Sequence, residues 1–165
     1  LDATGGGLSL DMIRDKAHSH FADAPGQGIL VIDYLQRLAR ALRSQGVTGL
    51  ELREAVTTLT EQLRALAFEI DCCVLAVVSQ NRQSGYKLQT SNLATAKESG
   101  DIEYTADVML TLGEDINTTP IKQKPGELLV KPLMLYIDKN RQGDKDKKID
   151  LLFSPDRQTF AEAAQ

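Results

Sequence analysis

The stretch Gly28-Ile29-Leu30-Val31-Ile32-Asp33 decides the class of fold. Four consecutive aliphatic residues that end on an aspartate are typical of a strand buried on both faces of a sheet. A second apolar run, Cys73–Ser79, follows a polar stretch over 36–49 and a predicted helix over 50–69. The order strand, helix, strand predicts a right-handed parallel crossover unit.

The remaining elements extend this unit on both sides. Ser9 is suited to cap a helix that begins at Leu10 and ends near Phe21. Three further strands are predicted, over 107–112, 133–137 and 149–153. The first is expected to lie parallel to the two strands above. The other two are expected to form a hairpin with a turn at 142–144. Polar loops are predicted over 80–96 and 114–126, and a last turn and short strand over 156–160. The pattern is an α/β fold with a mostly parallel sheet and a C-terminal antiparallel hairpin.

Composition excludes several classes of protein. The 165 residues, of which 42% are hydrophobic and 25% charged, suit a single globular domain over 1–165. No apolar run is long enough to cross a membrane, and residues 1–7 do not resemble a signal peptide. The adjacent Cys72 and Cys73 point to opposite faces of a strand, which disfavours a disulfide and fits a reducing, cytoplasmic compartment. Since the net charge is −4, any contact with DNA must come from local basic segments.

Polar residues follow the predicted strands where ligands of α/β sheets bind, beyond the carboxyl ends of the strands. Asp33 ends the first strand, and Ser79–Arg82 ends the second. Asp138–Arg141 follows the first strand of the hairpin, and Lys97–Tyr104 precedes the third strand. These segments therefore form the candidate functional rim.

Four ordered motifs on this rim resemble those of DnaB-type replicative helicases. Asp33-Tyr34-Leu35-Gln36 resembles the end of their IDYLQ segment, and Ser79-Gln80-Asn81-Arg82 resembles SQLNR with one residue fewer. The segment from Lys97 to Asp107 resembles RESGxIExxAD, and Lys139-Asn140-Arg141-Gln142-Gly143 resembles KxRxG. The resemblance spans nearly the whole chain and implies a RecA-like, P-loop NTPase-type three-layer sandwich.

The resemblance implies a nucleotide site that two subunits share. Asp33 would associate with Mg²⁺ through water, and Gln80 would sense the γ-phosphate of ATP. Lys139 and Arg141 would act in trans on the ATP of a neighbouring subunit, where an arginine stabilises the transferring phosphoryl group. The residues alone also permit plainer roles: a loop aspartate, a strand-end amide and a solvated basic turn.

The resemblance also implies a hexameric ring around single-stranded DNA, with a primase or a loader as a further partner. Lys97, Glu98 and Gly100 would line the pore, and Arg82 would add a phosphate contact. Lysine stands at position 97 where the family pattern has arginine, so the charge is kept but the bidentate fork is lost.

The chain departs from the family at the phosphate-binding loop. It contains no GxxxxGK[ST] sequence, and Tyr34 rather than a carboxylate follows Asp33. We therefore expect a RecA-like domain that is incomplete at its N-terminal side and does not hydrolyse ATP alone. A fragment of a complete helicase and a natural truncated relative both fit this expectation.

Three functions remain open at this point. The first is a piece of a helicase motor, and the second is a non-catalytic module that binds DNA or a helicase ring. The third is a regulatory or recombination ATPase of the RecA type. The segments Lys97–Tyr104 and Lys139–Gly143 favour the helicase over the third.

Overall fold

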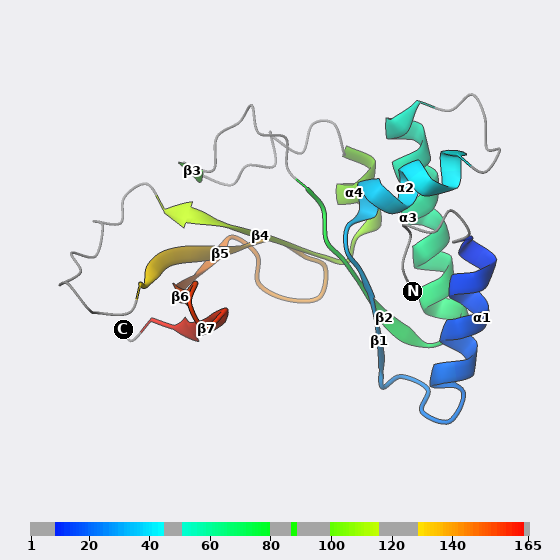
Figure 1. Cartoon of the computed structure of the whole chain (residues 1–165), viewed down its shortest axis with the longest axis horizontal. Coiled ribbons are helices and arrows are strands. Elements are labelled where there is room, and N and C mark those ends of the chain that lie inside the picture. Colours follow the sequence, from blue (N-terminus) through cyan, green and yellow to red (C-terminus); the bar gives the residue numbers. More distant parts are fainter. Residues whose placement is uncertain (1–8, 45–50, 80–86, 89–99, 116–128, 164–165) are drawn as a thin grey trace. The chain divides into compact units, whose positions relative to one another are not determined.

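The computed structural model describes residues 9–44, 51–79, 87–88, 100–115 and 129–163 (Figure 1). The chain divides into two compact units. The first unit comprises residues 1–80 and 98–105, and the second comprises residues 81–97 and 106–165. Each unit has its own sheet.

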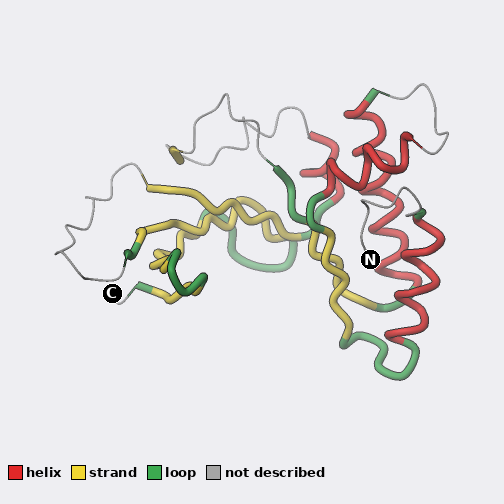
Figure 2. The backbone as a smooth tube through the Cα atoms, viewed as in Figure 1, coloured by secondary structure: helices red, strands yellow, loops and turns green. Residues whose placement is uncertain are grey.

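The first unit is built on two parallel strands. β1 (Gly28–Ile32) pairs with β2 (Cys72–Ala76) in register from Gly28 opposite Cys72 to Ile32 opposite Ala76. The connection between them holds two helices, α2 (Leu35–Ser44) and α3 (Leu52–Glu69). α1 (Leu10–Phe21) precedes β1, and the short α4 (Gly100–Thr105) completes the unit. The predicted parallel crossover is therefore confirmed (Figure 2).

The core of the first unit lies between its helices and one face of β1 and β2. α3 buries a stripe with helical spacing, made of Val56, Leu59, Leu63 and Leu66. Leu35 of α2 is fully buried in the same cluster, and α1 and α4 contribute Ile13 and Ile102. Gly28 is needed at the start of β1, because a Cβ there would come within 2.5 Å of the Phe21 ring.

α2 was not predicted. Residues 36–49 were expected to form a polar stretch, but residues 35–44 are helical. Leu35, Leu38 and Ala39 are buried, and Leu42 packs against them, so the apolar residues follow the i, i+3, i+4, i+7 pattern. Arg37, Arg40 and Arg43 give the segment a high average polarity, which masked this helical pattern in the sequence.

The second unit is a sheet with the strand order β3-β4-β5-β6-β7. Its strands are β3 (Lys87–Leu88), β4 (Val108–Asp115), β5 (Lys131–Asn140), β6 (Lys147–Ser154) and β7 (Thr159–Glu162). The predicted hairpin is confirmed as β5 and β6, and β7 extends it. The expectation that 107–112 would join the parallel strands is wrong, because β4 pairs antiparallel with β5.

A bulge interrupts the pairing of β4 with β5. Met109 lies opposite Lys139 and Leu110 lies opposite Ile137, so Asp138 is the additional residue on β5. Bulges bend a strand and change the direction of the side chains that follow. The bulge therefore shapes the segment that leads into Lys139 and Arg141.

The cysteines and the hydropathy of the helices were also considered in the sequence. Cys72 and Cys73 are both free thiols, and burial raises the pKa of the Cys72 thiol. Among the residues that the structure describes, no helix is long and apolar enough to span a membrane.

Candidate functional site

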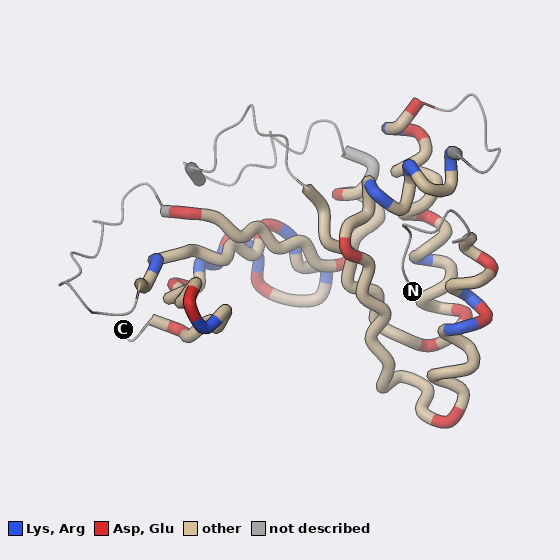
Figure 3. Tube along the Cα trace, viewed as in Figure 1, with Lys and Arg blue, Asp and Glu red and all other residues tan. Residues whose placement is uncertain are grey.

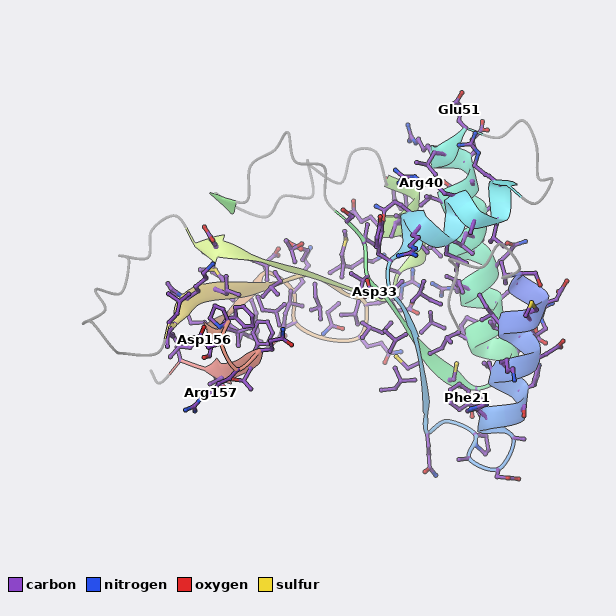
Figure 4. All side chains as sticks on the ribbon, in the orientation of Figure 1. Phe21, Asp33, Arg40, Glu51, Asp156 and Arg157 are labelled. Carbon is purple, nitrogen blue, oxygen red and sulfur yellow. The ribbon has the colours of Figure 1, made fainter. Side chains whose placement is uncertain are left out.

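The carboxyl end of β1 carries Asp33. The carboxylate is exposed, and it forms no hydrogen bond or ion pair with any residue in the described ranges. It lies where β1 passes into α2 (Figure 4), and the peptide bond from Asp33 to Tyr34 is cis. The predicted position of Asp33 at a strand end is therefore correct.

Backbone hydrogen bonds tie the end of β1 to the end of β2. Val77 donates its N–H to the carbonyl oxygen of Ile32 at 2.9 Å, and Leu35 donates to the carbonyl oxygen of Val77 at 2.8 Å. The first turn of α2 is thus held against the residues that follow β2. This fixes the backbone on either side of Asp33.

The Gln36 side chain also links the first turn of α2 to the segment that follows β2. Its Nε2 donates to the carbonyl oxygen of Ser79 at 2.9 Å, and its Oε1 accepts from the N–H of Ser79 at 3.1 Å. A side-chain amide has one donor group and one acceptor, so it satisfies both backbone groups of one residue. Gln36 therefore holds the residue directly before Gln80, the predicted sensor.

Gln36 belongs to the IDYLQ-like segment, but no role was predicted for it. The helical spacing of Leu35, Leu38 and Ala39 indicates a helix at this position, but no pattern in the sequence indicates the contact of Gln36 with Ser79.

Several predicted site residues lie outside the described residues. They are Gln80, Arg82, Lys97 and Glu98. Gly100 is the first residue of α4. Their predicted roles at the nucleotide and at DNA stay predictions.

Lys139 and Arg141 belong to the second unit. Lys139 is a half-buried residue of β5, and Arg141 is exposed just after that strand. Asp107 holds Arg141 twice: its carbonyl oxygen accepts the Arg141 N–H at 2.9 Å, and its carboxylate Oδ1 lies 2.9 Å from Nη1. Two of the motifs found in the sequence, those that contain Asp107 and Arg141, therefore meet in this unit.

The turn that carries Arg141 is closed by its own residues. Asn140 Oδ1 accepts the N–H of Gln142 at 3.3 Å, in the manner of an Asx turn. A Cβ on Gly143 would come within 2.6 Å of the Asn140 side-chain nitrogen, so Gly143 leaves room for the Asn140 side chain in its present position. The Asn140–Gly143 part of the KxRxG-like motif thus has a structural role besides any chemical one.

Asp138, the bulge residue of β5, is buried and precedes this turn in the sequence. Only 6% of its surface is exposed, and its carboxylate accepts a hydrogen bond from the Thr111 hydroxyl. Burial raises the pKa of the Asp138 carboxyl, the Thr111 hydrogen bond opposes that rise, and the charge of Asp146 adds to it. No sequence signal distinguished Asp138 from the charged residues around it.

The described residues suit Mg²⁺·ATP in part. Asp33 offers one exposed carboxylate at the strand end, and no group of three or more His, Cys, Asp or Glu residues gathers into a metal site within the described ranges. A single carboxylate fits a cation that is held mostly by water and phosphate oxygens. The 165 residues contain no GxxxxGK[ST] sequence of the kind that cradles phosphates.

We expect Gln36→Leu to lower the free energy of unfolding by about 1–2 kcal/mol, because two hydrogen bonds are lost at a partly solvated site. The amide of Ser79 should also exchange faster with solvent. Urea unfolding and amide hydrogen exchange measure the two effects. Gln62→Leu, on the exposed face of α3, is the matched control and should change stability by less than about 0.5 kcal/mol. Equal effects of the two substitutions would contradict the role given to Gln36.

The raised pKa of Asp138 predicts that the free energy of unfolding depends on pH. Because the folded-state pKa is raised, Asp138 favours the folded state most at a pH below the ordinary aspartate range, and this contribution is lost as the pH rises through the raised value. Asp138→Asn keeps an oxygen that can accept from Thr111 and removes the charge. The variant should gain stability relative to the unmodified chain as the pH rises from 4 to 7, in urea unfolding at each pH. A constant difference over this range would show that Asp138 does not titrate as proposed.

Comparison with known proteins gives the same family as the motifs. The family model described as "DnaB-like helicase C terminal domain" matches residues 2–162. The chain is 29% identical over 154 residues to the replicative DNA helicase DnaB of Mycoplasma genitalium, which covers 93% of the chain and 32% of that protein. It is 26% identical over 134 residues to a probable replicative DNA helicase of Trieres chinensis, covering 81% of the chain and 29% of that protein.

A solved structure of a DnaB-like replicative helicase, described with its interactions with primase, superposes with a TM-score of 0.70. The match has 23% sequence identity and covers 93% of this chain and 35% of the other, so it shows the fold. The chain thus spans about a third of the length of the relatives it matches. The fold is the RecA-like α/β fold, and the chain belongs to the family of the DnaB-like helicase C-terminal domain.

Proposed function

We propose that this chain forms part of the motor of a replicative helicase, in which ATP hydrolysis drives translocation on single-stranded DNA. The observation that carries the proposal is the exposed Asp33 at the end of β1, linked through Gln36 to the residue before Gln80. A carboxylate and an amide at neighbouring strand ends suit a nucleotide that must be both bound and sensed.

In this proposal the first unit works on the nucleotide of its own subunit. When bound, Mg²⁺·ATP supplies the phosphoryl group and the cation that offsets its charge. Asp33 would orient the hydrated cation, and the Gln80 amide would donate a hydrogen bond to an oxygen of the γ-phosphate. Gln36 links the first turn of α2, just after Asp33, to Ser79, the residue before Gln80.

The second unit works on the nucleotide of a neighbouring subunit. Arg141 and Lys139 stabilise negative charge that develops on the transferring phosphoryl oxygens. Arg141 lies on a turn that Asp107, Asn140 and Gly143 hold in shape, so little order has to be gained when it binds. A hexameric ring is the arrangement we propose, with Lys97, Glu98, Gly100 and Arg82 toward single-stranded DNA.

A primase or a loader is a further proposed partner. The support is the solved structure of a DnaB-like replicative helicase, which is described with its interactions with primase.

A second candidate function is a non-catalytic module that binds DNA or a helicase ring. The observation that favours it is the absence of a GxxxxGK[ST] sequence from the 165 residues. Such a module would use the same Arg141 turn against the nucleotide of a complete motor. The family match gives no support to a recombinase or another regulatory ATPase.

The test is a chimera in which this chain replaces the aligned 154-residue segment of the Mycoplasma genitalium helicase. The chimera should hydrolyse ATP, and Arg141→Ala should lower kcat by about 10³-fold or more, as expected for an arginine that acts in trans. Arg157→Ala, an exposed arginine of the same unit, is the matched control and should leave kcat unchanged.

Steady-state ATP hydrolysis with single-stranded DNA is the measurement, after ring assembly of each variant is verified by sedimentation. An Arg141→Ala chimera that assembles and keeps its full kcat would contradict the role in trans. A chimera that assembles but has no activity even with Arg141 would favour the non-catalytic module.

A further inference from the structure

α2 carries three arginines to which the proposed helicase function assigns no role. Arg37, Arg40 and Arg43 are spaced three residues apart, and all three are exposed. The helix contains no acidic residue, so it carries three positive charges within ten residues of a chain whose net charge is −4. Figure 3 shows α2 with basic bands only, and Figure 4 marks Arg40 on it.

No partner within the described ranges neutralises this row. None of the three guanidinium groups forms an ion pair or a side-chain hydrogen bond there. By contrast, Arg14 of α1 is paired with Asp11 and Glu69, and Arg141 is paired with Asp107. The arginines of α2 thus lie close together on one helix without an ion-pair partner in the described ranges.

The placement works against the stability of the helix itself. Like charges three residues apart repel each other, and Arg37 lies in the first turn, where the helix dipole disfavours a cation. The opposite face of α2 is fixed, since Leu35, Leu38 and Ala39 are buried in the core. The arginines are therefore held on a rigid support, and an external anion would relieve their repulsion.

The spacing fits the phosphates of a nucleic-acid strand. Arg37 and Arg43 are six residues apart, which is about 9 Å along the helix axis. Three guanidinium groups spread over that length can contact neighbouring phosphates of a single strand. Guanidinium forks bind phosphate oxygens in pairs, and α2 has no aromatic side chain to stack on a base.

We propose that Arg37, Arg40 and Arg43 bind the phosphodiester backbone of single-stranded DNA, as a contact surface separate from residues 82 and 97–100. The choice of single-stranded DNA rests on the proposed function. The contact is independent of base sequence, because it involves phosphates only.

The experiment measures the binding of fluorescein-labelled dT20 to the whole 165-residue chain by anisotropy, over 20–200 mM salt. The test variant is R37Q/R40Q/R43Q. The matched control is K16Q/K145Q/R157Q, which removes three exposed charges elsewhere and has the same net charge. A third variant, Lys97→Ala, reports on the predicted pore contact, and thermal unfolding verifies that all variants remain folded.

We expect R37Q/R40Q/R43Q to weaken binding at low salt by about tenfold or more. The slope of log K against log salt should become shallower by about 2, since each lost phosphate contact on a single strand removes about 0.7. The control should keep the slope of the unmodified chain, and a dA20 probe should give the same result as dT20.

Three outcomes would overturn the proposal. The first is equal weakening by the test variant and the control, which would mean that net charge alone matters. The second is tighter binding through these arginines to duplex DNA or to poly-glutamate of equal charge, which would assign the surface to a different partner. The third is an unchanged slope with loss of binding in Lys97→Ala, which would leave the proposed function intact and remove only the role of α2.

Discussion

The parallel pairing of β1 with β2 is the constraint on which the first unit depends. Five residues of each strand pair in register, so both strands end at the same rim, and the connection between them must cross one face of the sheet. α2 and α3 make that crossing, and the burial of Leu35, Leu59 and Leu66 fixes them there. This geometry places Asp33 at the end of β1 and brings Gln36 within hydrogen-bond distance of Ser79.

The second unit carries a charged turn at the end of β5, and contacts within the unit hold this turn in place. The bulge at Asp138 changes the direction of β5 just before Lys139, and the buried hydrogen bond from Thr111 holds the bulge. Asp107 then fixes Arg141 through both backbone and side chain. In the proposed ring, this turn completes the nucleotide site of a neighbouring subunit, so each unit would serve a different ATP.

Residues with a strong local signal were predictable from the sequence. The aliphatic runs that form β1 and β2, the leucine stripe of α3 and the Ser9 cap, whose hydroxyl accepts the Met12 N–H at 3.1 Å, all follow local rules. The antiparallel pairing of β4 was missed, because a short apolar run does not reveal its partner. The contacts of Gln36, Asp107 and Asp138 join residues between 27 and 43 positions apart, which no local pattern encodes.

In the proposed ring, Asp33 acts on the nucleotide of its own subunit and Arg141 acts on the nucleotide of the neighbouring subunit. The decisive measurement mixes two chimeras, one with Asp33→Asn and the other with Arg141→Ala, each inactive alone. A ring of both has sites where an intact Asp33 meets an intact Arg141 from the adjacent subunit, so a 1:1 mixture should regain roughly a quarter of the ATP hydrolysis of the unmodified ring. If the mixture of co-assembled rings hydrolyses ATP no faster than the two variants apart, Asp33 and Arg141 do not act at a site shared by neighbouring subunits.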